Sequence, residues 1–434
     1  MLQRSPQPPS SRWTLTATED VFEDLRQASA AIRGLAAQIL AAAGSPVLLS
    51  SDEILALVAA AGVHALALQP VGERIHLFLL LPRGDVRLIV TESPLPASQV
   101  AAACELLQAE LGIRPATRGL PPLVDTDEDD MQPINDAIRV LSKALIQPIA
   151  TGLEPGSPLI VVPYRDLALI PFPLLTLPDG RQIVDAHAVS LAPSFASLSL
   201  LGQPHPSSGA PRCFVAGDPL TDPKYRLIPL EGASREAADV RDLLLASGVP
   251  AASLSFHLHE QATETGWRRE ARGAHLVHLA CHATVREPAS QSALFLAADA
   301  ASDGQLSPAE IAMVRLDGAL VFLSACQTGL GHPTADGVLG LSRAFLEAGA
   351  RAVVMSMWKV ADESTAVLAR YFYQHLLAAP PDSAAEALRQ AMVAARAELR
   401  AGRVISSRNE VLDDHPANWA PFLLLGDGGF LFHA

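Results

Sequence analysis

The sequence predicts an α/β protein with a mostly parallel central sheet that is covered by helices on both faces. Three observations indicate this class. The 434 residues are 49% hydrophobic and 18% charged, a composition typical of a packed globular protein rather than a disordered chain. After residue 212, short apolar runs alternate with longer amphipathic segments, an order that favours strand–helix–strand units. Two apolar runs, 274–282 and 318–325, have the length of buried strands and end at loops.

The first half begins with a segment rich in Pro and Ser, residues 1–13, which we expect to be a disordered tail. A helix is predicted at 19–43, and a second helix after Ser50, Ser51 and Asp52, which are good N-cap residues. The remaining predictions, in chain order, are strands at 65–68, 74–81 and 86–91, a helix at 97–112, a solvated acidic loop at 125–130, a helix at 131–147, a buried strand at 157–164 and a turn-rich apolar segment at 167–175.

A segment rich in Pro, Gly and Ser, residues 202–211, is predicted to be a linker. It separates an N-terminal α/β region at 14–201 from a second domain at 212–434. Apolar periodicity in the second domain predicts strands at 213–216, 253–259, 275–282, 319–325 and 352–357, a hairpin near 292–297, and helices at 233–247, 264–272, 307–314, 337–348, 362–378 and 384–401.

The charge and cysteine content exclude several classes of function. A formal net charge of -14 argues against direct nucleic-acid binding and against binding to anionic membranes. The four cysteines form no CxxC pair and no metal-ligand spacing, which suits a reducing compartment. The N-terminus lacks the apolar core of a signal peptide, and no apolar run reaches the roughly 18 residues of a membrane-spanning helix. We therefore expect a cytoplasmic protein without a metal or other cofactor.

A histidine and a cysteine, His282 and Cys326, lie at the ends of two predicted buried strands. In an open α/β sheet, reactive groups gather outside the carboxyl ends of the strands, and a thiol nucleophile needs a nearby base. Free cysteine is otherwise a common core residue, and Cys104, Cys213 and Cys281 fit that role within apolar patterns. Composition and periodicity alone leave Cys326 open between nucleophile and core residue.

Several segments occur together in an order that is specific in combination: 216–219, 278–282 (His-Leu-Ala-Cys-His), 323–329 (Leu-Ser-Ala-Cys-Gln-Thr-Gly), 336–345, 349–359 and 415–422. In these the second half resembles the CHAT family of caspase-like cysteine proteases, which are related to separase and the caspases. The first half also looks like the N-terminal part of such proteins, at 161–164 and 169–175. The resemblance implies a caspase-like α/β/α sandwich preceded by a pseudo-caspase-like α/β half. Many members carry helical repeats in front, which we do not find in this sequence.

The resemblance implies that Cys326 is the nucleophile and His282 the general base and acid. It also implies an oxyanion hole formed by the backbone N–H groups of Cys326 and Ala283. Relatives usually have glycine at the position of Ala283. Alanine can still donate its N–H there, provided that its φ is negative.

The resemblance further implies that the strand at 353–359 binds an extended substrate by strand addition, with Ser356 and Trp358 along the substrate wall. Asp362 is predicted to line the first specificity pocket. Simpler alternatives stay open for two of these residues. Trp358 can pack in the core, and Asp362 can cap the helix that it precedes.

These predictions describe a cysteine endopeptidase that cleaves a partner protein at an exposed extended loop, with an activating sensor protein as a second partner. The resemblance implies a role in a bacterial defence or regulated-cell-death system, with gasdermin-like proteins among the substrates. Two other functions stay open. One is a catalytically silent caspase-like binding or scaffold module. The other is an unrelated α/β hydrolase or acyltransferase, although residues 324–329 do not match a G-x-S-x-G elbow.

Overall fold

A computed structural model describes residues 49–84, 87–113, 131–201, 210–284, 289–316, 318–325 and 335–433. Several predictions lie outside the described residues. These are the tail at 1–13, the helix at 19–43, the acidic loop at 125–130, most of the linker at 202–211, and Cys326.

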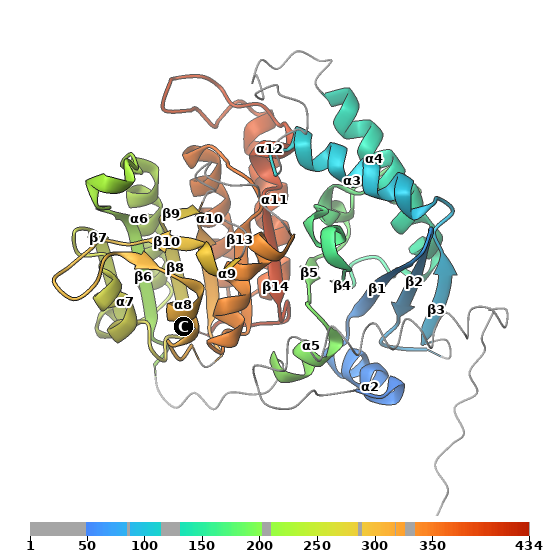
Figure 1. Ribbon diagram of the computed structural model, residues 1–434, viewed down its shortest axis with the longest axis horizontal. Coiled ribbons are helices and arrows are strands. Elements are labelled where there is room, and N and C mark those ends of the chain that lie inside the picture. Colours follow the sequence, from blue (N-terminus) through green and yellow to red (C-terminus); the bar gives the residue numbers. More distant parts are fainter. Residues whose placement is uncertain are drawn as a thin grey trace, which may run out of the picture.

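The described chain forms a sheet of 11 strands in the order β3-β2-β1-β4-β5-β14-β13-β12-β8-β6-β7. Figure 1 shows β1–β3 at one end of this sheet and β6 and β7 at the other. Most neighbouring pairs are parallel, including β8 with β12 and β12 with β13, so the predicted mixed α/β class is confirmed. The strands are β1 (His64–Val71), β2 (Arg74–Leu80), β3 (Leu88–Glu92), β4 (Leu159–Val162), β5 (Val189–Leu191), β6 (Cys213–Pro219), β7 (Leu254–His259), β8 (Leu276–Ala280), β12 (Leu320–Ser324), β13 (Ala352–Ser356) and β14 (Phe422–Gly426).

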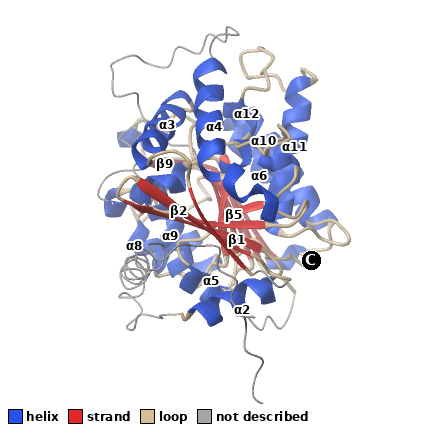
Figure 2. Cartoon of the chain, turned by 90° about the vertical axis from the view of Figure 1, so that its right-hand side faces the viewer, coloured by secondary structure: helices blue, strands red, loops and turns tan. Residues whose placement is uncertain are grey.

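Helices cover both faces of the sheet, with α3, α4, α6, α10 and α11 on one face and α2, α5, α8 and α9 on the other (Figure 2). Their bounds are α2 (Ser51–Ala61), α3 (Ala97–Glu110), α4 (Met131–Leu145), α5 (Phe195–Leu201), α6 (Glu231–Ala246), α7 (Glu264–Glu270), α8 (Pro308–Ala312), α9 (Ala335–Glu347), α10 (Asp362–Leu376), α11 (Ala384–Arg400) and α12 (Pro416–Trp419). In the part of the chain that the structure describes, no helix has both the length and the apolar character needed to cross a membrane.

The local chemistry explains why these segments form these elements. Ser50 caps α2 as predicted, in a capping box with Glu53 that satisfies backbone N–H groups at the start of the helix. The central strands β8 and β12 are covered on both faces, and their residues are accordingly almost all apolar and buried. Alternate residues of β8 face opposite helix layers, because successive side chains of a strand point to opposite faces.

Strand β14 joins the two halves of the molecule. It pairs antiparallel with β13 and parallel with β5, where Leu425 lies opposite Leu191. The sheet therefore runs without a break from the first half into the second. The sequence analysis did not predict this strand, although the apolar run at 422–425 is its signal.

The predicted strand at 275–282 is interrupted at Cys281. β8 ends at Ala280, and the chain then enters β9 (His282–Thr284), which belongs to a second sheet of three antiparallel strands. Its other members are β10 (Ala293–Phe295) and β11 (Gln305–Leu306). The predicted hairpin near 292–297 is therefore incomplete. β10 pairs with β9 on one side and with β11 on the other, so three strands form this sheet.

Candidate active site

His282 is the first residue of β9, just beyond the carboxyl end of β8. Its side chain is buried, and its backbone pairs with Phe295 of β10. His282 therefore lies at the edge of the main sheet where β8 ends, and its pairing within the small sheet fixes its backbone there.

The strands that lead to His282 and Cys326 end in register. β8 and β12 are adjacent and parallel, and Ala280 pairs with Ser324 at their carboxyl ends. The N–H of Cys281 donates to the Ser324 carbonyl at 3.2 Å and extends this contact by one residue. His282 follows Ala280 by the same number of residues as Cys326 follows Ser324. Cys326 itself lies outside the described residues. The strands that lead to His282 and to Cys326 nevertheless end at the same level of the sheet.

A backbone carbonyl orients the imidazole of His282. The Nε2 atom lies 2.7 Å from the carbonyl oxygen of Ile228. Because a carbonyl can only accept, this contact assigns the proton of the neutral ring to Nε2 and leaves Nδ1 as the basic nitrogen. The sequence analysis assigned no third group to the histidine. Any residue type can supply a backbone carbonyl, so no sequence signal marks Ile228.

Asp218 fixes the loop that carries Ile228 through two hydrogen bonds. Its carboxylate accepts a hydrogen bond from the Leu230 N–H at 2.7 Å and another from the Ser234 hydroxyl at 2.9 Å. Asp218 has a φ of 46°, a left-handed conformation in which Asp is found more often than most other non-glycine residues. The motif at 216–219 therefore contributes to the site by holding the carbonyl that orients the imidazole.

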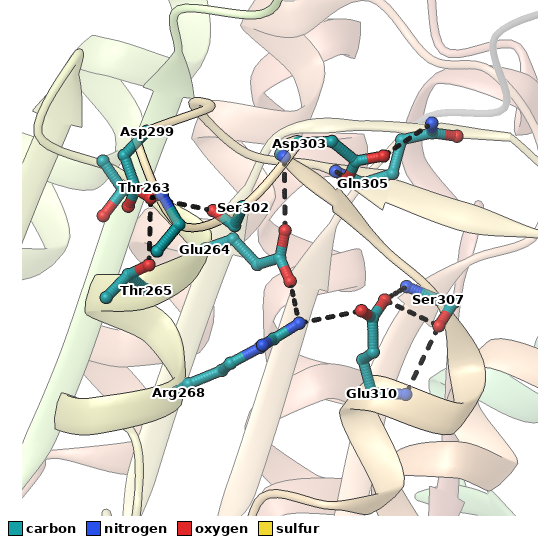
Figure 3. A network of polar contacts seen from close by, with 12 residues as sticks. Thr263, Glu264, Thr265, Arg268, Asp299, Ser302, Asp303, Gln305, Ser307 and Glu310 are labelled. Carbon is teal, nitrogen blue, oxygen red and sulfur yellow. Dashed lines mark hydrogen bonds and ion pairs between the residues drawn. The ribbon is translucent and has the colours of Figure 1, made fainter.

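The small sheet that contains His282 is anchored by a network of charges (Figure 3). The carboxylate of Glu264 on α7 is buried, pairs with Arg268, and accepts a hydrogen bond from the Gly304 N–H at 3.2 Å. Arg268 also donates to Glu310 at 2.8 Å, and Glu310 forms a capping box with Ser307 at the start of α8. This network fixes the turn between β10 and β11 against two helices, and β10 in turn holds β9.

Ala283, the second residue of β9, is the predicted oxyanion donor that the structure describes. It lies opposite Leu294 of β10 and is not among the described non-glycine residues with positive φ. The condition for alanine at this position is therefore met. The second predicted donor, the N–H of Cys326, lies outside the described residues.

Asp362 is the first residue of α10, and the N-cap position belongs to Ala361, which makes no side-chain capping hydrogen bond. The alternative that Asp362 caps the helix is therefore wrong. The residue instead lies against the first turn of α6, where an added Cβ at Gly232 would come within 2.4 Å of the Asp362 Cβ. Glycine is thus required for the two helices to approach this closely.

The surroundings of Asp362 connect it to the histidine. Burial, followed by the carboxylates of Glu363 and Glu236, raises the pKa of Asp362, while His282 and Lys359 act in the opposite direction. The electrostatic effect of His282 places the carboxyl group within interaction range of the imidazole. A place for Asp362 in the substrate site stays a prediction.

Ser356 and Trp358 lie at the end of β13 and just beyond it, and both are buried. The Ser356 hydroxyl donates to the Trp358 carbonyl at 2.6 Å, and the indole N–H donates to the Ala417 carbonyl at 3.0 Å. β13 pairs with β12 over residues 352–355 and with β14 over 352–356. The predicted addition of a substrate strand along 353–359 is therefore wrong for 353–355, where both edges of the strand are already paired. This geometry favours the core alternative for Trp358, and substrate contact by either residue stays a prediction.

Cys104, Cys213 and Cys281 are buried and unbridged, as expected for core residues. Burial raises the pKa of both Cys213 and Cys281 to about 12, which disfavours the reactive thiolate. In the described ranges, no group of three or more His, Cys, Asp or Glu side chains is arranged to hold a metal ion.

Two relatives are similar to part of this sequence. Tetratricopeptide repeat protein 28 of Homo sapiens is 28% identical over 342 residues, which are 67% of this chain and 13% of that protein. The Mus musculus protein of the same name is 36% identical over 121 residues, which are 28% of this chain and 4% of that protein. This chain therefore spans only a small fraction of the length of these relatives.

The fold is similar to that of separase in the Saccharomyces cerevisiae separase–securin complex, with a TM-score of 0.56 and 11% sequence identity. The match covers 86% of this chain and 30% of the separase chain. At this identity the likeness shows the fold alone, which is a caspase-like cysteine-protease fold. The sequence profile of the CHAT domain matches residues 135–427, and with well over half of its length inside that profile, the chain belongs to the CHAT domain family.

Proposed function

We propose that this chain is a cysteine endopeptidase in which Cys326 is the nucleophile and His282 the general base and acid. The observation that carries this proposal is the oriented imidazole. Nε2 of His282 is held by the Ile228 carbonyl, which leaves Nδ1 as the basic nitrogen, and the histidine strand ends in register with the strand that leads to Cys326.

The proposed reaction is peptide hydrolysis in two steps. Nδ1 of His282 takes the thiol proton while the Cys326 sulfur attacks the scissile carbonyl carbon, and the N–H groups of Ala283 and Cys326 stabilise the oxyanion. The protonated imidazole then gives its proton to the leaving amine, and a thioester remains. Water, activated by the same nitrogen, attacks the thioester and releases the carboxylic acid and the free thiol.

The partner protein and its biological setting belong to the same proposal. An extended loop of a protein substrate is the expected ligand, an activating sensor protein the expected regulator, and the cytoplasm the expected compartment. A role in a bacterial defence or regulated-cell-death system, with a gasdermin-like substrate, rests on the family resemblance alone.

Cleavage profiling on a peptide library, read by mass spectrometry, tests the proposed activity. Wild type and Cys326→Ala are compared at equal concentration, since this substitution removes only one sulfur atom. We expect cleavage by wild type at a consistent sequence and none by the variant. Cleavage that survives in Cys326→Ala would overturn the mechanism. A wild-type chain that cleaves nothing and whose Cys326 is no more reactive than an ordinary thiol would favour the silent scaffold.

We further propose that Asp362 lines the first specificity pocket and selects a cationic side chain before the scissile bond. Its half-buried carboxyl group lies in interaction range of His282, where a substrate lysine or arginine would be drawn toward the site. Asp362→Asn should lower kcat/KM for such peptides by about 10- to 100-fold, the worth of a hydrogen bond to a charged group of about 1.5–3 kcal/mol.

The matched control for this prediction is Asp52→Asn, which removes an exposed carboxylate from the first turn of α2 and should leave kcat/KM unchanged. Peptides with an apolar residue before the scissile bond should be cleaved by Asp362→Asn about as well as by wild type. An equal loss for cationic and apolar peptides would contradict the pocket assignment without affecting the proposed nucleophile.

A further inference from the structure

A carboxylate is buried close to the carboxyl ends of β8 and β12. Glu236 projects from α6 with only 3% of its surface exposed. Its Oε2 accepts a hydrogen bond from the Ser324 hydroxyl at 3.1 Å, and its Oε1 lies 3.3 Å from Nε2 of His278. Nδ1 of His278 lies 3.1 Å from the Tyr373 hydroxyl. Four side chains from α6, β12, β8 and α10 thus form one polar chain inside the sheet–helix interface.

The positions of the protons decide which of these four side chains donate hydrogen bonds and which accept them. Burial raises the pKa of Tyr373 well above its ordinary value, so the hydroxyl keeps its proton and can donate to Nδ1 of His278. The remaining ring proton then lies on Nε2, which faces Glu236. Ser324 donates to the other carboxylate oxygen. One carboxylate oxygen of Glu236 therefore accepts from Ser324, while the Nε2 proton of His278 lies near the other oxygen without a well-aligned hydrogen bond.

This arrangement is a poor way to hold a fold together. Oε1 of Glu236 and Nε2 of His278 are both buried, and neither makes a well-aligned hydrogen bond with a described residue despite their separation of 3.3 Å. Buried polar atoms without a partner are uncommon, and apolar side chains of similar volume would often stabilise such a position better. A buried carboxylate in this position is costly to the fold, which favours a task other than packing.

The place of Glu236 identifies that task. Ser324 is the last residue of β12, and Cys326 follows two positions later. Glu236 also acts electrostatically on Asp362, which in turn lies in range of His282. The Glu236 carboxylate therefore contacts the end of the strand that leads to Cys326. It also raises the pKa of Asp362, a residue that interacts electrostatically with His282.

We propose that Glu236 is a positioning residue that fixes Ser324, and through it the point from which the chain departs toward Cys326. His278, which contacts Tyr373 through Nδ1, lies 3.3 Å from the carboxylate, and the hydroxyl of Ser324 is the group that the carboxylate fixes. This proposal rests on the proposed protease function, because it assigns Glu236 an effect on the placement of Cys326. Neither Glu236 nor Ser324 touches the substrate.

The isosteric variant Glu236→Gln separates positioning from charge. The amide oxygen of glutamine can still accept from Ser324, and its NH2 group can donate to Nε2 of His278 once the ring proton moves to Nδ1. We therefore expect Glu236→Gln to recover most of the activity that Glu236→Ala loses. A role that depends on the negative charge would leave both variants equally impaired.

A double-mutant cycle on Glu236→Ala and Ser324→Ala tests the proposal, with kcat, KM and the iodoacetamide alkylation rate of Cys326 as readouts. Each single variant should lower kcat by up to about 100-fold, the effect of a displacement of about 1 Å, with KM changed by less than about threefold. The double variant should be no slower than the worse single variant, because both remove one interaction. Ser190→Ala, a buried serine in β5, is the matched control and should leave kcat within about twofold.

Each outcome of this cycle decides the proposal. Losses that multiply in the double variant, or an unchanged kcat in Ser324→Ala, would overturn it. If Glu236→Ala fails to fold, Ser324→Ala and Glu236→Gln still give the two opposed expectations of loss and recovery. If wild type cleaves no peptide, the protease function fails separately, and the alkylation rate of Cys326 through the same cycle decides whether Glu236 and Ser324 position the thiol.

Discussion

His282→Ala is expected to lower kcat by about 10²- to 10⁴-fold, the usual contribution of a positioned general acid and base. The reason lies in the tautomer that the Ile228 carbonyl selects. With Nε2 committed to that carbonyl at 2.7 Å, only Nδ1 is left to take the thiol proton. Removal of the ring removes the group that is proposed to carry a proton between the thiol and the leaving amine. A continuous assay with a fluorogenic peptide from the profiling experiment measures kcat and KM.

Two controls make this prediction specific. His375→Ala removes an imidazole that pairs with Asp382 at 3.0 Å near the far end of α10, and it should leave kcat within about twofold. Free imidazole added to His282→Ala should restore part of the rate, because the substitution leaves a space of matching size. A His282→Ala enzyme that retains wild-type kcat and a wild-type melting temperature would assign the proton transfer to another group.

Trp358→Ala is expected to lower the free energy of unfolding by about 3–5 kcal/mol, the range measured when a buried aromatic side chain is truncated. The indole is 1% exposed, and its N–H is bonded to the Ala417 carbonyl at 3.0 Å. The truncation therefore creates a cavity and leaves the Ala417 carbonyl without this donor. Equilibrium urea denaturation, followed by far-UV circular dichroism, measures the loss.

The companion variant Trp358→Phe distinguishes a core residue from a substrate-wall residue. A core tryptophan predicts a partial loss of stability, from the smaller ring and the missing N–H, together with an unchanged KM. If Trp358→Phe instead kept wild-type stability and raised KM tenfold, the indole would belong to the substrate wall and the packing interpretation would be wrong.

The parts of the site that could be predicted from sequence are those that lie at the end of a buried strand. Buried apolar runs mark β8 and β12 clearly, so the histidine that follows one and the strand that leads to Cys326 could be anticipated, but not the register between them. β14 was missed because its apolar run comes after a long irregular segment and two helices. The carbonyl of Ile228 was missed for a different reason. It is a backbone group, and the residue that carries it has an exposed apolar side chain with no chemical signature.

Residues with two plausible roles could be resolved only by tertiary contacts. Asp362 is a residue type that often caps helices and lies at the start of one, yet the N-cap position falls on Ala361. The carboxyl group of Asp362 instead lies against Gly232 of α6. Glu236 could not be singled out from sequence, because a glutamate in an amphipathic helix is usually on the solvated face. Its burial depends on α10 and β8, which lie far from it in sequence.

The place of β14 in the sheet has a consequence for how the protein is made. This strand follows every other described strand in the sequence, yet it lies in the middle of the sheet, between β5 and β13. During synthesis on the ribosome, the edges of β5 and β13 that face β14 stay unpaired until residues 422–426 have emerged. Such a long-range closing step is slow, because the entropy of a large loop is lost before the contacts form. β13, whose end leads to Trp358 and Asp362, gains its second neighbouring strand only at that moment.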